Sequence, residues 1–272
     1  MKTLLSVIIP TKNEAINIKS CLKSIKNQSY QNIEIIVVDN FSSDQTIKTT
    51  ESLGAAVFKK GPERSQQRNF GARKAKGRYL LFLDADMTME TNVVKQAIGI
   101  FTNNPHTKAL VVPEITRGKN YWARVRGLER ACYLNQPDIE AARIFEKETF
   151  LKAGGFDETL IAAEDWDLTN RIKNLGQIGR TDSQIVHHEG KLSLIGHLKK
   201  KYYYSQNINL YAQKYPERFK SQSGIKRAQV FLNHWRLLKT QPCLSTGIVI
   251  LKLLEYLVYL AAKISIKQNA KT

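Results

Sequence analysis

The chain has 272 residues, of which 42% are hydrophobic, and this composition excludes a largely disordered protein. Its 42 Lys and Arg residues exceed its 24 Asp and Glu residues, which gives a formal net charge of +18 and a pI near 9.8. Such a charge predicts an anionic partner, which can be nucleic acid, an anionic membrane surface or a phosphorylated substrate. Charge alone does not choose among the three.

The three cysteines, Cys21, Cys132 and Cys243, stand far apart and lack any spacing typical of zinc sites or disulfide frameworks. We therefore expect a reduced, cytoplasmic protein. The apolar run in "MKTLLSVIIPTKNE" is about as long as a buried strand, and no small-residue cleavage site follows it. We interpret this run as the first strand of the fold rather than as a signal peptide.

Apolar runs and helical periodicity alternate along the first third of the chain. Fully apolar runs predict strands at residues 4–10, 33–39, 55–60 and 79–84. Apolar residues at helical spacing from Ile18 to Ile25 predict the first helix, and turn and cap residues frame two more at 46–53 and 65–76. Strands that alternate with helices indicate a parallel α/β sheet covered on both faces.

Polar side chains stand where these strands end. Thr11, Asp39, Asp84 and Asp86 all follow apolar runs, at the sheet edge where ligands bind in open α/β folds. Neither G-x-G-x-x-G nor G-x-x-x-x-G-K follows any of the strands. The sequence therefore excludes phosphate binding in the manner of a Rossmann dehydrogenase or a P-loop enzyme.

In the segment "YLLFLDADMT", an apolar strand is followed directly by two aspartates, Asp84 and Asp86, with one residue between them. Two such carboxylates suit a hard cation such as Mg²⁺ or Mn²⁺, which takes few protein oxygens and completes its shell with water and substrate phosphate. The alternative is that both aspartates only begin a turn and cap the next helix.

Four ordered motifs carry a resemblance to a known family: "SVIIPTKNE", "IEIIVVDNFSSDQT", "RSQQRNFGARKAKGRYLLFLDADM" and "GGFDETLIAAEDWDL". Together they resemble the family 2 glycosyltransferases of the GT-A fold, from about Ser6 to Glu189. The resemblance implies an α/β fold with a mostly parallel central sheet flanked by helices. It also implies inverting transfer, of the hexosyltransferase type, from a UDP- or GDP-linked sugar to an acceptor hydroxyl or phosphate, with a divalent metal.

The resemblance also implies roles for individual residues at the nucleotide end. The residues expected to bind the nucleotide sugar are Pro10, Thr11, Asn13, Glu14, Asp39, Arg68 and Asp84. Among them, Asp39 would contact the base or ribose, Arg68 the phosphates, and Asp84 the ribose or the metal. Asp86 would be the direct metal ligand. The alternatives are that Asp39 caps its turn and that Arg68 is a solvated cation.

A second group of acids, in "AAEDWDLTNRI", stands at the predicted start of a helix after a Gly-Gly turn. Inversion needs a base on the acceptor side, opposite the departing diphosphate. The resemblance makes Asp165 this base, with Glu164 beside it. Alternatively, Glu164, Asp165 and Asp167 only complement the positive end of their helix.

Two further sites follow from the resemblance and from residue type. His187, in "QIVHHEGKLSL", matches the place of an extra metal ligand in several resembled enzymes, although a lone histidine is often only packed or hydrogen-bonded. Arg143 and Trp122 give cationic and aromatic character to the segment before the second acidic motif and are candidates for acceptor binding. Their alternative is a solvated helix face.

The last third of the chain interleaves basic and apolar residues. Its longest charge-free apolar stretch falls short of the ~18 to 20 residues of a membrane-spanning helix, so we expect no ordinary span. As a helix, the tail places Lys252, Glu255, Tyr259, Lys263 and Lys267 on one stripe, surrounded mostly by apolar residues. This pattern predicts an amphipathic helix.

Such a helix can cover the catalytic domain, pair with another copy, or lie in a membrane interface. Lys199–Lys201 and Tyr202–Tyr204 favour an anionic membrane surface. A lipid-linked acceptor would then be brought to the enzyme, which we expect to be peripheral on the cytoplasmic face.

We thus expect a catalytic domain over residues 1–225, with a nucleotide-binding half of about 1–115 and an acceptor half of about 116–225, followed by a helical extension over 226–272. Two alternatives remain at this point. A sugar-phosphate nucleotidyltransferase normally has a glycine-rich N-terminal loop, which "PTKNE" does not supply. A basic nucleic-acid-binding protein would show a recognisable motif, and none is visible.

Overall fold

A computed structural model describes residues 2–222 and 224–269, with side chains described as far as residue 265. The chain forms two compact units that interleave along the sequence. The first unit contains the chain up to Glu114, together with Glu140–Thr159 and Glu164–His187. The second contains Ile115–Ile139, Leu160–Ala163 and the chain from His188 on.

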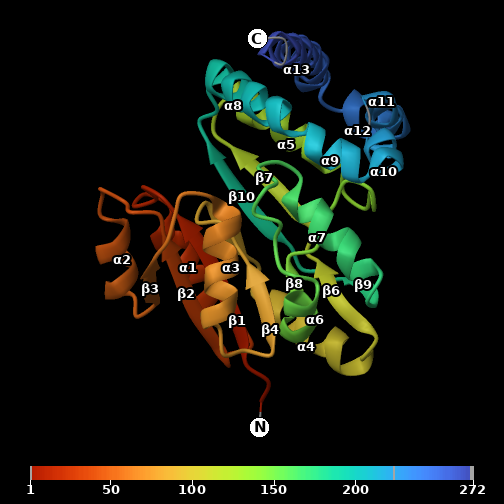
Figure 1. The fold of residues 1–272 in the computed structure, drawn as a ribbon. Helices are drawn as coiled ribbons and strands as arrows, with labels where there is room; N and C mark the ends of the chain where they lie inside the picture. Colours follow the sequence, from red (N-terminus) through yellow and green to blue (C-terminus); the bar gives the residue numbers. More distant parts are fainter. Residues whose placement is uncertain (1, 223, 270–272) are drawn as a thin grey trace. The chain divides into compact units, whose positions relative to one another are not determined.

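A seven-stranded sheet forms the centre of the first unit (Figure 1). In spatial order its strands are β3 (Ala56–Lys59), β2 (Ile33–Asp39), β1 (Leu5–Thr11), β4 (Tyr79–Phe82), β8 (Ile144–Glu146), β6 (Thr107–Val111) and β9 (Gln177–Arg180). Strands β3, β2, β1 and β4 are parallel neighbours, whereas β8 runs antiparallel to both β4 and β6. The sheet is therefore mostly parallel, as predicted.

Alternate residues of β1 enter two different cores. Val7 and Ile9 pack in one hydrophobic cluster with Leu22, whereas Ile8 packs in another with Ala72. Because successive side chains of a strand point to opposite faces, these clusters lie on the two faces of the sheet. Every residue of β1 is buried, which explains its continuous apolar run.

Six helices belong to the first unit among the described residues. They are α1 (Ile18–Lys26), α2 (Thr46–Ser52), α3 (Arg64–Lys74), α4 (Val93–Asn103), α6 (Lys147–Lys152) and α7 (Glu164–Lys173). Helix α3 approaches β1 closely at Gly71, where an added Cβ would lie 2.5 Å from Cγ2 of Ile8. This close approach sets the distance of α3 from the sheet. It thereby also sets the position of Arg68, which lies on the same helix.

A second, three-stranded sheet has the order β5 (Met87–Met89), β10 (Ile185–Gly190), β7 (Glu114–Gly118). Strand β5 follows the two aspartates of the D-A-D segment and pairs antiparallel with β10, with Met87 opposite His187. This register brings a histidine that is 101 residues away in sequence beside Asp86.

The second unit is mostly helical. Its helices are α5 (Tyr121–Cys132), α8 (Leu194–Asn207), α9 (Asn209–Lys214), α10 (Pro216–Ser221), α11 (Gly224–Asn233), α12 (Trp235–Lys239) and α13 (Pro242–Asn269). Helix α13 packs against α8 and α5 (Figure 1), and its Leu244, Ile248 and Leu251 share a core with Val125 and Leu128. The predicted helical C-terminal part is therefore present, although residues 270–272 and the side chain of Lys267 lie outside the described part.

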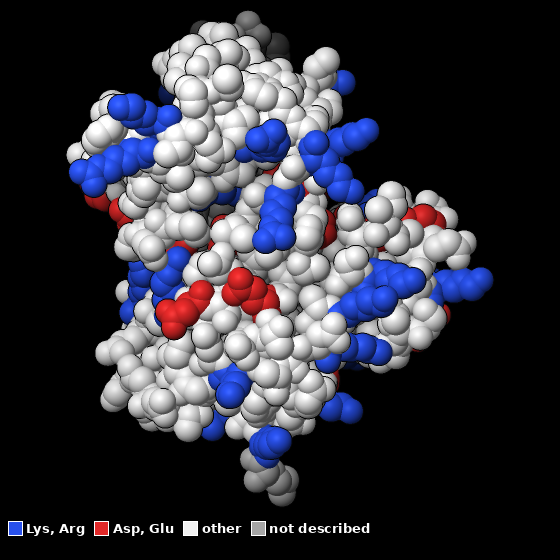
Figure 2. Space-filling view, turned by 180° about the vertical axis from the view of Figure 1, so that it is seen from behind, with Lys and Arg blue, Asp and Glu red and all other residues white. Residues whose placement is uncertain are grey.

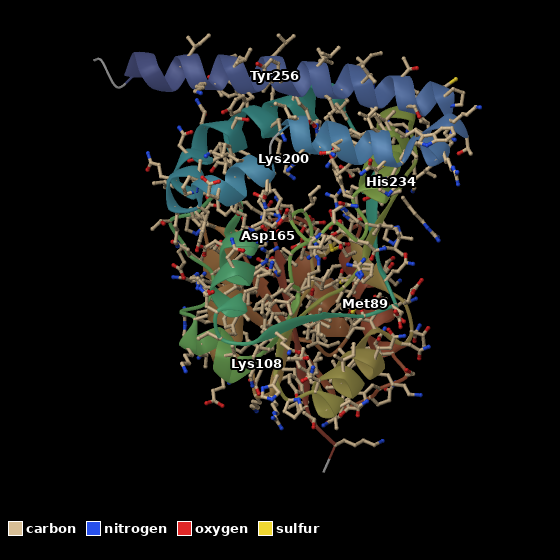
Figure 3. All side chains as sticks on the ribbon, turned by 90° about the vertical axis from the view of Figure 1, so that its right-hand side faces the viewer. Met89, Lys108, Asp165, Lys200, His234 and Tyr256 are labelled. Atoms are coloured by element: carbon tan, nitrogen blue, oxygen red, sulfur yellow. The ribbon has the colours of Figure 1, made fainter. Side chains whose placement is uncertain are left out.

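The expectation of no ordinary membrane span in the tail rests on its short charge-free apolar stretch. Within α13, Pro242–Ser265 form 24 residues with a mean hydropathy of 1.7, long and apolar enough to cross a bilayer by length and composition. The helix is apolar enough because its charged side chains are few and widely spaced, and the expectation that it does not span stays a prediction. The same helix carries Tyr256, which Figure 3 labels.

The positive net charge is visible at the surface. On the face shown in Figure 2, lysine and arginine side chains clearly outnumber aspartate and glutamate side chains. This surface agrees with the formal net charge of +18.

Candidate active site

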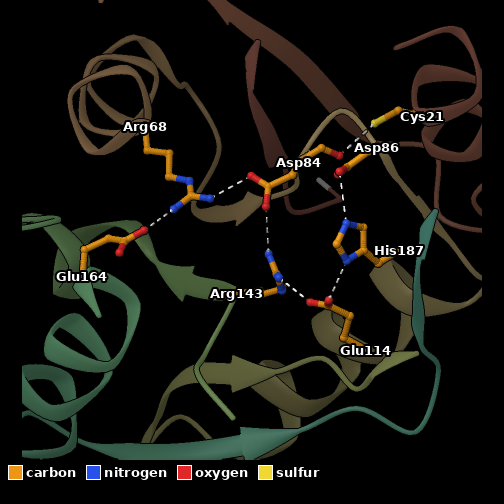
Figure 4. Close-up of polar contacts among 8 residues, drawn as sticks. All are labelled: Cys21, Arg68, Asp84, Asp86, Glu114, Arg143, Glu164 and His187. Atoms are coloured by element: carbon orange, nitrogen blue, oxygen red, sulfur yellow. Dashed lines mark hydrogen bonds and ion pairs between the residues drawn. The ribbon is translucent and has the colours of Figure 1, made fainter. Parts of the chain in front are cut away.

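The D-A-D segment forms a tight turn between β4 and β5, in which the backbone N–H of Met87 donates to the carbonyl oxygen of Asp84 at 3.0 Å. This is the turn that the alternative interpretation predicted. The turn does not use the two carboxylates, which contact other parts of the first unit (Figure 4).

Asp84 faces two guanidinium groups. Its Oδ1 accepts a hydrogen bond from Nη2 of Arg68 at 2.7 Å, and its Oδ2 lies 4.0 Å from Nη1 of Arg143. Burial acts to raise the pKa of the Asp84 carboxyl, but Arg68, Arg143 and Arg64 outweigh burial and lower that pKa well below its usual range. Asp84 is therefore ionised at neutral pH, with both oxygens directed at cations.

Arg68 also reaches the second acidic motif. Its Nη1 donates to Oε1 of Glu164 at 3.2 Å, and its side chain is only 7% exposed. Burial, and then the nearby Asp165, raise the pKa of Glu164, and Arg68 opposes them. The interpretation of Arg68 as a solvated cation is therefore wrong, because Arg68 is a buried bridge between two carboxylates.

Asp86 contacts His187, whose Nε2 lies 3.0 Å from Oδ2 of the aspartate. The other ring nitrogen, Nδ1, lies 3.3 Å from Oε1 of Glu114, which also accepts a hydrogen bond from Arg143 through its second oxygen. Glu114 was not among the predicted site residues. A signal did exist, because Glu114 follows the apolar run "ALVVP" just as Asp39 and Asp84 follow theirs.

These contacts join seven side chains into one continuous series, which we call the ionic chain (Figure 4). In order of contact its members are Glu164, Arg68, Asp84, Arg143, Glu114, His187 and Asp86. Acidic groups alternate with basic or imidazole groups along it. The ionic chain thus connects the D-A-D turn at one end of the site with the start of α7 at the other.

The structure assigns the three acids of α7 to different environments. Asp167 is fully buried and accepts a hydrogen bond from Nε of Arg171 at 2.9 Å. Glu164 belongs to the ionic chain. Asp165 is half-buried, and among the described residues no Lys, Arg or His lies within ion-pair distance of its carboxylate. Of the three, Asp165 alone has no ion-pair partner among the described residues.

The Gly-Gly turn before α7 is fixed to helix α3. Gly155 has a φ of +70°, and an added Cβ would lie 2.6 Å from Oδ1 of Asn69. Asn69 accepts a hydrogen bond from the backbone N–H of Phe156 at 2.9 Å, and Arg171 of α7 donates to the carbonyl oxygen of Gly155 at 2.7 Å. These bonds tie α7 to the helix that carries Arg68, and they account for the meeting of Arg68 with Glu164.

The predicted nucleotide residues lie at the carboxyl ends of β1 and β2. Pro10 and Thr11 end β1, and Asp39, opposite Thr11, ends β2. The Asp39 carboxylate is fully buried and accepts hydrogen bonds from Oγ1 of Thr11 at 2.8 Å and from the backbone N–H of Ser42 at 2.7 Å. The structure thus shows the turn-capping contacts of Asp39, and its role at the base or ribose stays a prediction.

Asn13 and Glu14 lie in the loop after β1. Asn13 is exposed and has a φ of +55°, and the backbone N–H of Glu14 donates to Oγ1 of Thr46 at 2.7 Å. Burial raises the pKa of Glu14, and the charges of Asp86 and Asp84 raise it further, although a hydrogen bond from Asn17 opposes them. The charges of Asp86 and Asp84 are thus close enough to Glu14 to act on its carboxyl.

Residues 6–156, more than half of the chain, match the family model for glycosyl transferase family 2. The chain belongs to this family. An uncharacterized glycosyltransferase of Haemophilus influenzae is 28% identical over 189 residues, which cover 62% of this chain and 62% of that protein. A Campylobacter jejuni protein named as a GalNAc(5)-diNAcBac-PP-undecaprenol beta-1,3-glucosyltransferase is 36% identical over 92 residues, which cover 30% of this chain and 29% of that one. The chain thus spans less than two thirds of the length of these relatives.

The fold of this glycosyltransferase agrees with that of solved relatives. A mannosyltransferase of Pyrobaculum calidifontis, in complex with GDP-Man and Mn²⁺, superposes with a TM-score of 0.61, at 18% identity, over 97% of this chain and 87% of that one. At this identity the likeness is one of fold. The family and the GT-A fold inferred from the sequence motifs are both confirmed.

Two side chains of the site have donor atoms of the kind that a divalent cation would use. Among the described residues, no group of three or more His, Cys, Asp or Glu side chains is arranged to hold a metal. Asp86, about a third exposed, and Nε2 of His187 nevertheless fit a cation that completes its shell with water and diphosphate. Nδ1 of His187 is buried without a hydrogen bond, which leaves that ring only partly satisfied. Asp84 fits less well as a ligand, because its oxygens face Arg68 and Arg143.

The predicted acceptor residues lie in different units. Arg143 belongs to the first unit and to the ionic chain. Trp122 belongs to α5 of the second unit, where it is partly buried against the core that includes Val125 and Ile248. Neither residue lies on a solvated helix face, so that alternative is wrong for both.

Proposed function

We propose that this family 2 enzyme transfers a sugar from a UDP- or GDP-linked donor to an acceptor, with inversion and with Mn²⁺ or Mg²⁺ as cofactor. The observation that carries the proposal is the ionic chain, which connects the cation-binding candidates Asp86 and His187 to the start of α7, where Asp165 lies. The GDP-Man and Mn²⁺ of the mannosyltransferase with the same fold support the donor class and the metal.

Asp165 is the proposed general base. It accepts the proton of the acceptor hydroxyl as the new glycosidic bond forms and the bond to the diphosphate breaks. Its only polar contact among the described residues, apart from its backbone, is a hydrogen bond from the backbone N–H of Trp166 at 2.8 Å. An unpaired carboxylate at this place can take up a proton without first losing a cation.

The other site residues hold this arrangement. Asp86 and His187 would bind the cation, which when bound stabilises the negative charge that develops on the departing diphosphate. Arg68 keeps Glu164 and Asp84 in place, and Asp39 supports the loop in which Asn13 and Glu14 would line the nucleotide pocket with Pro10 and Thr11. In this proposal, residues up to about 115 form the nucleotide-binding half, residues 116–225 the acceptor half, and 226–272 the extension.

The test is product analysis with purified protein, Mn²⁺ and a panel of UDP- and GDP-sugars. Glycosyl transfer releases a nucleoside diphosphate and a product of inverted anomeric configuration, which NMR distinguishes. Release of pyrophosphate would instead indicate nucleotidyl transfer and would overturn the proposal.

We further propose that the acceptor is lipid-linked and that α13 lies flat in the cytoplasmic face of a membrane. One face of α13 is apolar and exposed. Its large side chains, each between 36% and 61% exposed, are Val249, Ile250, Leu253, Tyr256, Leu257, Leu260 and Ile264. At 100° per residue these positions fall on one helix face about 120° wide.

The opposite face of α13 is buried and carries ions. Glu255 is 5% exposed and contacts His197 of α8 at 2.8 Å and Lys252 at 2.8 Å, and Lys252 also pairs with the buried Glu129 of α5. A helix that buries Glu255 and exposes a row of large apolar side chains has the polarity expected next to lipid rather than water.

These ion pairs also favour a helix that lies flat over one that spans. A span would take Glu255 and Lys252 into the hydrocarbon and away from their partners on α8 and α5, at high free-energy cost. The exposed lysines Lys199, Lys200 and Lys263 supply charge for anionic headgroups. The undecaprenol-linked name of the Campylobacter jejuni relative supports a lipid-linked acceptor.

A further inference from the structure

One aromatic side chain of the first unit is exposed to solvent. Phe41, in the turn between β2 and α2 (residues 40–45), is 66% exposed. The other described aromatic residues of this unit are all buried or partly buried. Single exposed apolar residues are common on protein surfaces, so exposure alone does not imply a role for the ring.

The backbone of Phe41 also has an unfavourable conformation. Its φ is +51°, in the left-handed region, where the Cβ atom crowds the backbone and glycine or asparagine is usual. A bulky aromatic residue in this conformation lowers stability, and an exposed ring recovers little of that loss through burial. Strained residues of this kind are concentrated at ligand sites and switches. Strain and exposure together indicate that the ring of Phe41 binds a ligand.

Hydrogen bonds on both sides hold Phe41 in this conformation. Before it, Nδ2 of Asn40 donates to the carbonyl oxygen of Pro62 at 2.7 Å. After it, the backbone N–H and the hydroxyl of Ser42 both donate to the carboxylate of Asp39, at 2.7 and 2.6 Å. The ring therefore extends from a fixed backbone, which reduces the conformational entropy that a ligand contact would cost.

The turn that carries Phe41 lies at the same edge of the sheet as the D-A-D segment. Strands β2 and β4 are separated by β1 alone, and all three are parallel. At ~5 Å between neighbouring strands, the carboxyl ends of β2 and β4 lie about 10 Å apart. An extended nucleoside diphosphate places its base at a comparable distance from its phosphates. Phosphates at the D-A-D segment would thus bring the base to the turn after β2.

The loop after β1 connects the two ends of this site. The backbone N–H of Asn13 donates to Oγ of Ser42 at 2.8 Å, which joins the loop to the turn after β2. Burial raises the pKa of Glu14 in the same loop, and the charges of Asp86 and Asp44 raise it further. One carboxyl is therefore within electrostatic reach of both the D-A-D segment and the turn after β2.

We propose that Phe41 binds the nucleobase of the sugar donor by stacking its ring on the face of the base. This inference rests on the proposed transfer from a nucleotide sugar, and it adds a donor-binding residue outside the predicted set. Every base has a π-face, so a stacked phenyl ring supplies affinity without choosing between uracil and guanine. That choice depends on groups that form hydrogen bonds with the edge of the base.

The first test is calorimetric titration of UDP and GDP, each with Mn²⁺, into the wild type and two variants. Phe41→Gly removes the ring, and glycine adopts a φ of +51° without strain, so the turn is kept. We expect this variant to bind the nucleoside diphosphate about 5- to 100-fold more weakly, the usual effect of losing one stacked base. Phe41→Tyr keeps the ring and should bind like the wild type.

Pyrophosphate with Mn²⁺ provides the control ligand, because it has phosphates but no base. We expect it to bind the wild type and Phe41→Gly equally. The control variant is Leu175→Ala, at an exposed apolar residue of the same unit just before β9, and it should bind every ligand like the wild type. An equal fall in pyrophosphate and nucleotide affinity in Phe41→Gly would overturn the inference, because the loss would then not involve the base.

The second test detects the contact itself. With Mg²⁺ in place of the paramagnetic Mn²⁺, NMR should show nuclear Overhauser effects between the protons of the bound base and the ring of Phe41. Their absence from the bound complex would overturn the inference.

The titrations also separate this inference from the proposed function. If the wild type binds neither a nucleoside diphosphate nor a nucleotide sugar, the donor assignment fails and the inference fails with it. If the wild type and Phe41→Gly bind the same nucleoside diphosphate equally, the inference alone fails and the proposed function stands.

Discussion

Nη2 of Arg68 lies 2.7 Å from Oδ1 of Asp84 in a site where the arginine side chain is only 7% exposed. The same guanidinium reaches Glu164, so one side chain links two acidic motifs that stand 80 residues apart in the sequence. The fork of an arginine can serve two carboxylates at once, whereas the single ammonium of a lysine cannot match that geometry.

We therefore predict that Arg68→Lys weakens donor binding and lowers stability. We also predict that Arg68→Met lowers the free energy of unfolding by about 3–5 kcal/mol, which is the usual effect of leaving buried carboxylates without their partner. Urea unfolding and donor titration measure the two effects. The matched control is Arg73→Lys on the exposed side of the same helix. Equal stability of Arg68→Met and the wild type would contradict the bridging role.

Substitutions at Asp165 and Asp167 should have different effects, the first on catalysis and the second on stability. Asp165→Asn removes the proposed base, so we predict a fall in kcat of about 10² to 10⁴ with little change in donor affinity. Asp167→Asn breaks a buried pair with Arg171 and should lower the melting temperature instead. Steady-state kinetics and thermal unfolding of both variants provide the comparison. Undiminished kcat in Asp165→Asn would remove it from the mechanism.

Glu129 makes the stability of the second unit depend on pH. Burial acts to raise its pKa, but Arg126 and Lys252 outweigh burial and lower the pKa of Glu129 from 4.5 to about 2. A carboxyl whose folded-state pKa lies below its unfolded-state value stabilises the fold above that unfolded value, and this contribution is lost as pH falls toward the folded-state pKa.

We thus predict that Glu129→Gln is less stable than the wild type at pH 7, and that the difference shrinks between about pH 4.5 and pH 2. Urea unfolding at several pH values measures this difference. The exposed Glu217→Gln serves as the control. A difference that stays constant as the pH falls would show that the Glu129 charge contributes nothing to the stability.

The exposed apolar face of α13 should control membrane binding. The double variant Leu253→Asp, Leu257→Asp places two charges on that face, and we predict that it no longer floats with anionic lipid vesicles. Leu232→Asp, at a residue of α11 that is 72% exposed, should float like the wild type. Undiminished flotation of the double variant would exclude this face as the contact.

The flat orientation of α13 has a separate test. Cys243 is exposed at the start of α13, whereas Cys21 and Cys132 are buried, so Ser265→Cys adds one partly exposed thiol near the other end. With inside-out membrane vesicles, an impermeant maleimide should label both ends if the helix lies on the cytoplasmic face. Protection of one end alone would indicate a span.

The sequence predicted the parts of this fold that depend on local periodicity. The four apolar runs of the N-terminal third became β1, β2, β3 and β4. Strands β1 and β4 are buried at every position, and strands buried on both faces are continuously apolar, whereas the edge strand β3 is only partly buried. The strand-end rule likewise located Asp84 and Asp86. Sequence periodicity predicts which face of a helix or strand is buried and where that element ends, and the structure shows these features.

What the sequence did not predict is which distant groups meet. Glu114 and His187 face each other because two strands pair, and no local pattern indicates that pairing. For α13, the charged stripe was visible in the sequence, but its partners Glu129 and His197 lie on other helices. Because a buried ion is stable only with such partners, the buried face of α13 could not be inferred from α13 alone.

The central claim is that Asp86 binds a cation that joins the enzyme to a nucleotide-diphosphate sugar. Calorimetric titration of UDP- and GDP-sugars with Mn²⁺ into the wild type and Asp86→Ala tests it most directly, with Asp182→Asn, an exposed aspartate outside the ionic chain, as the control. We predict that one donor binds the wild type and the control equally, and binds Asp86→Ala at least about 10-fold more weakly, since loss of even an outer partner of a metal ligand costs that much. Equal binding to all three proteins would contradict the claim.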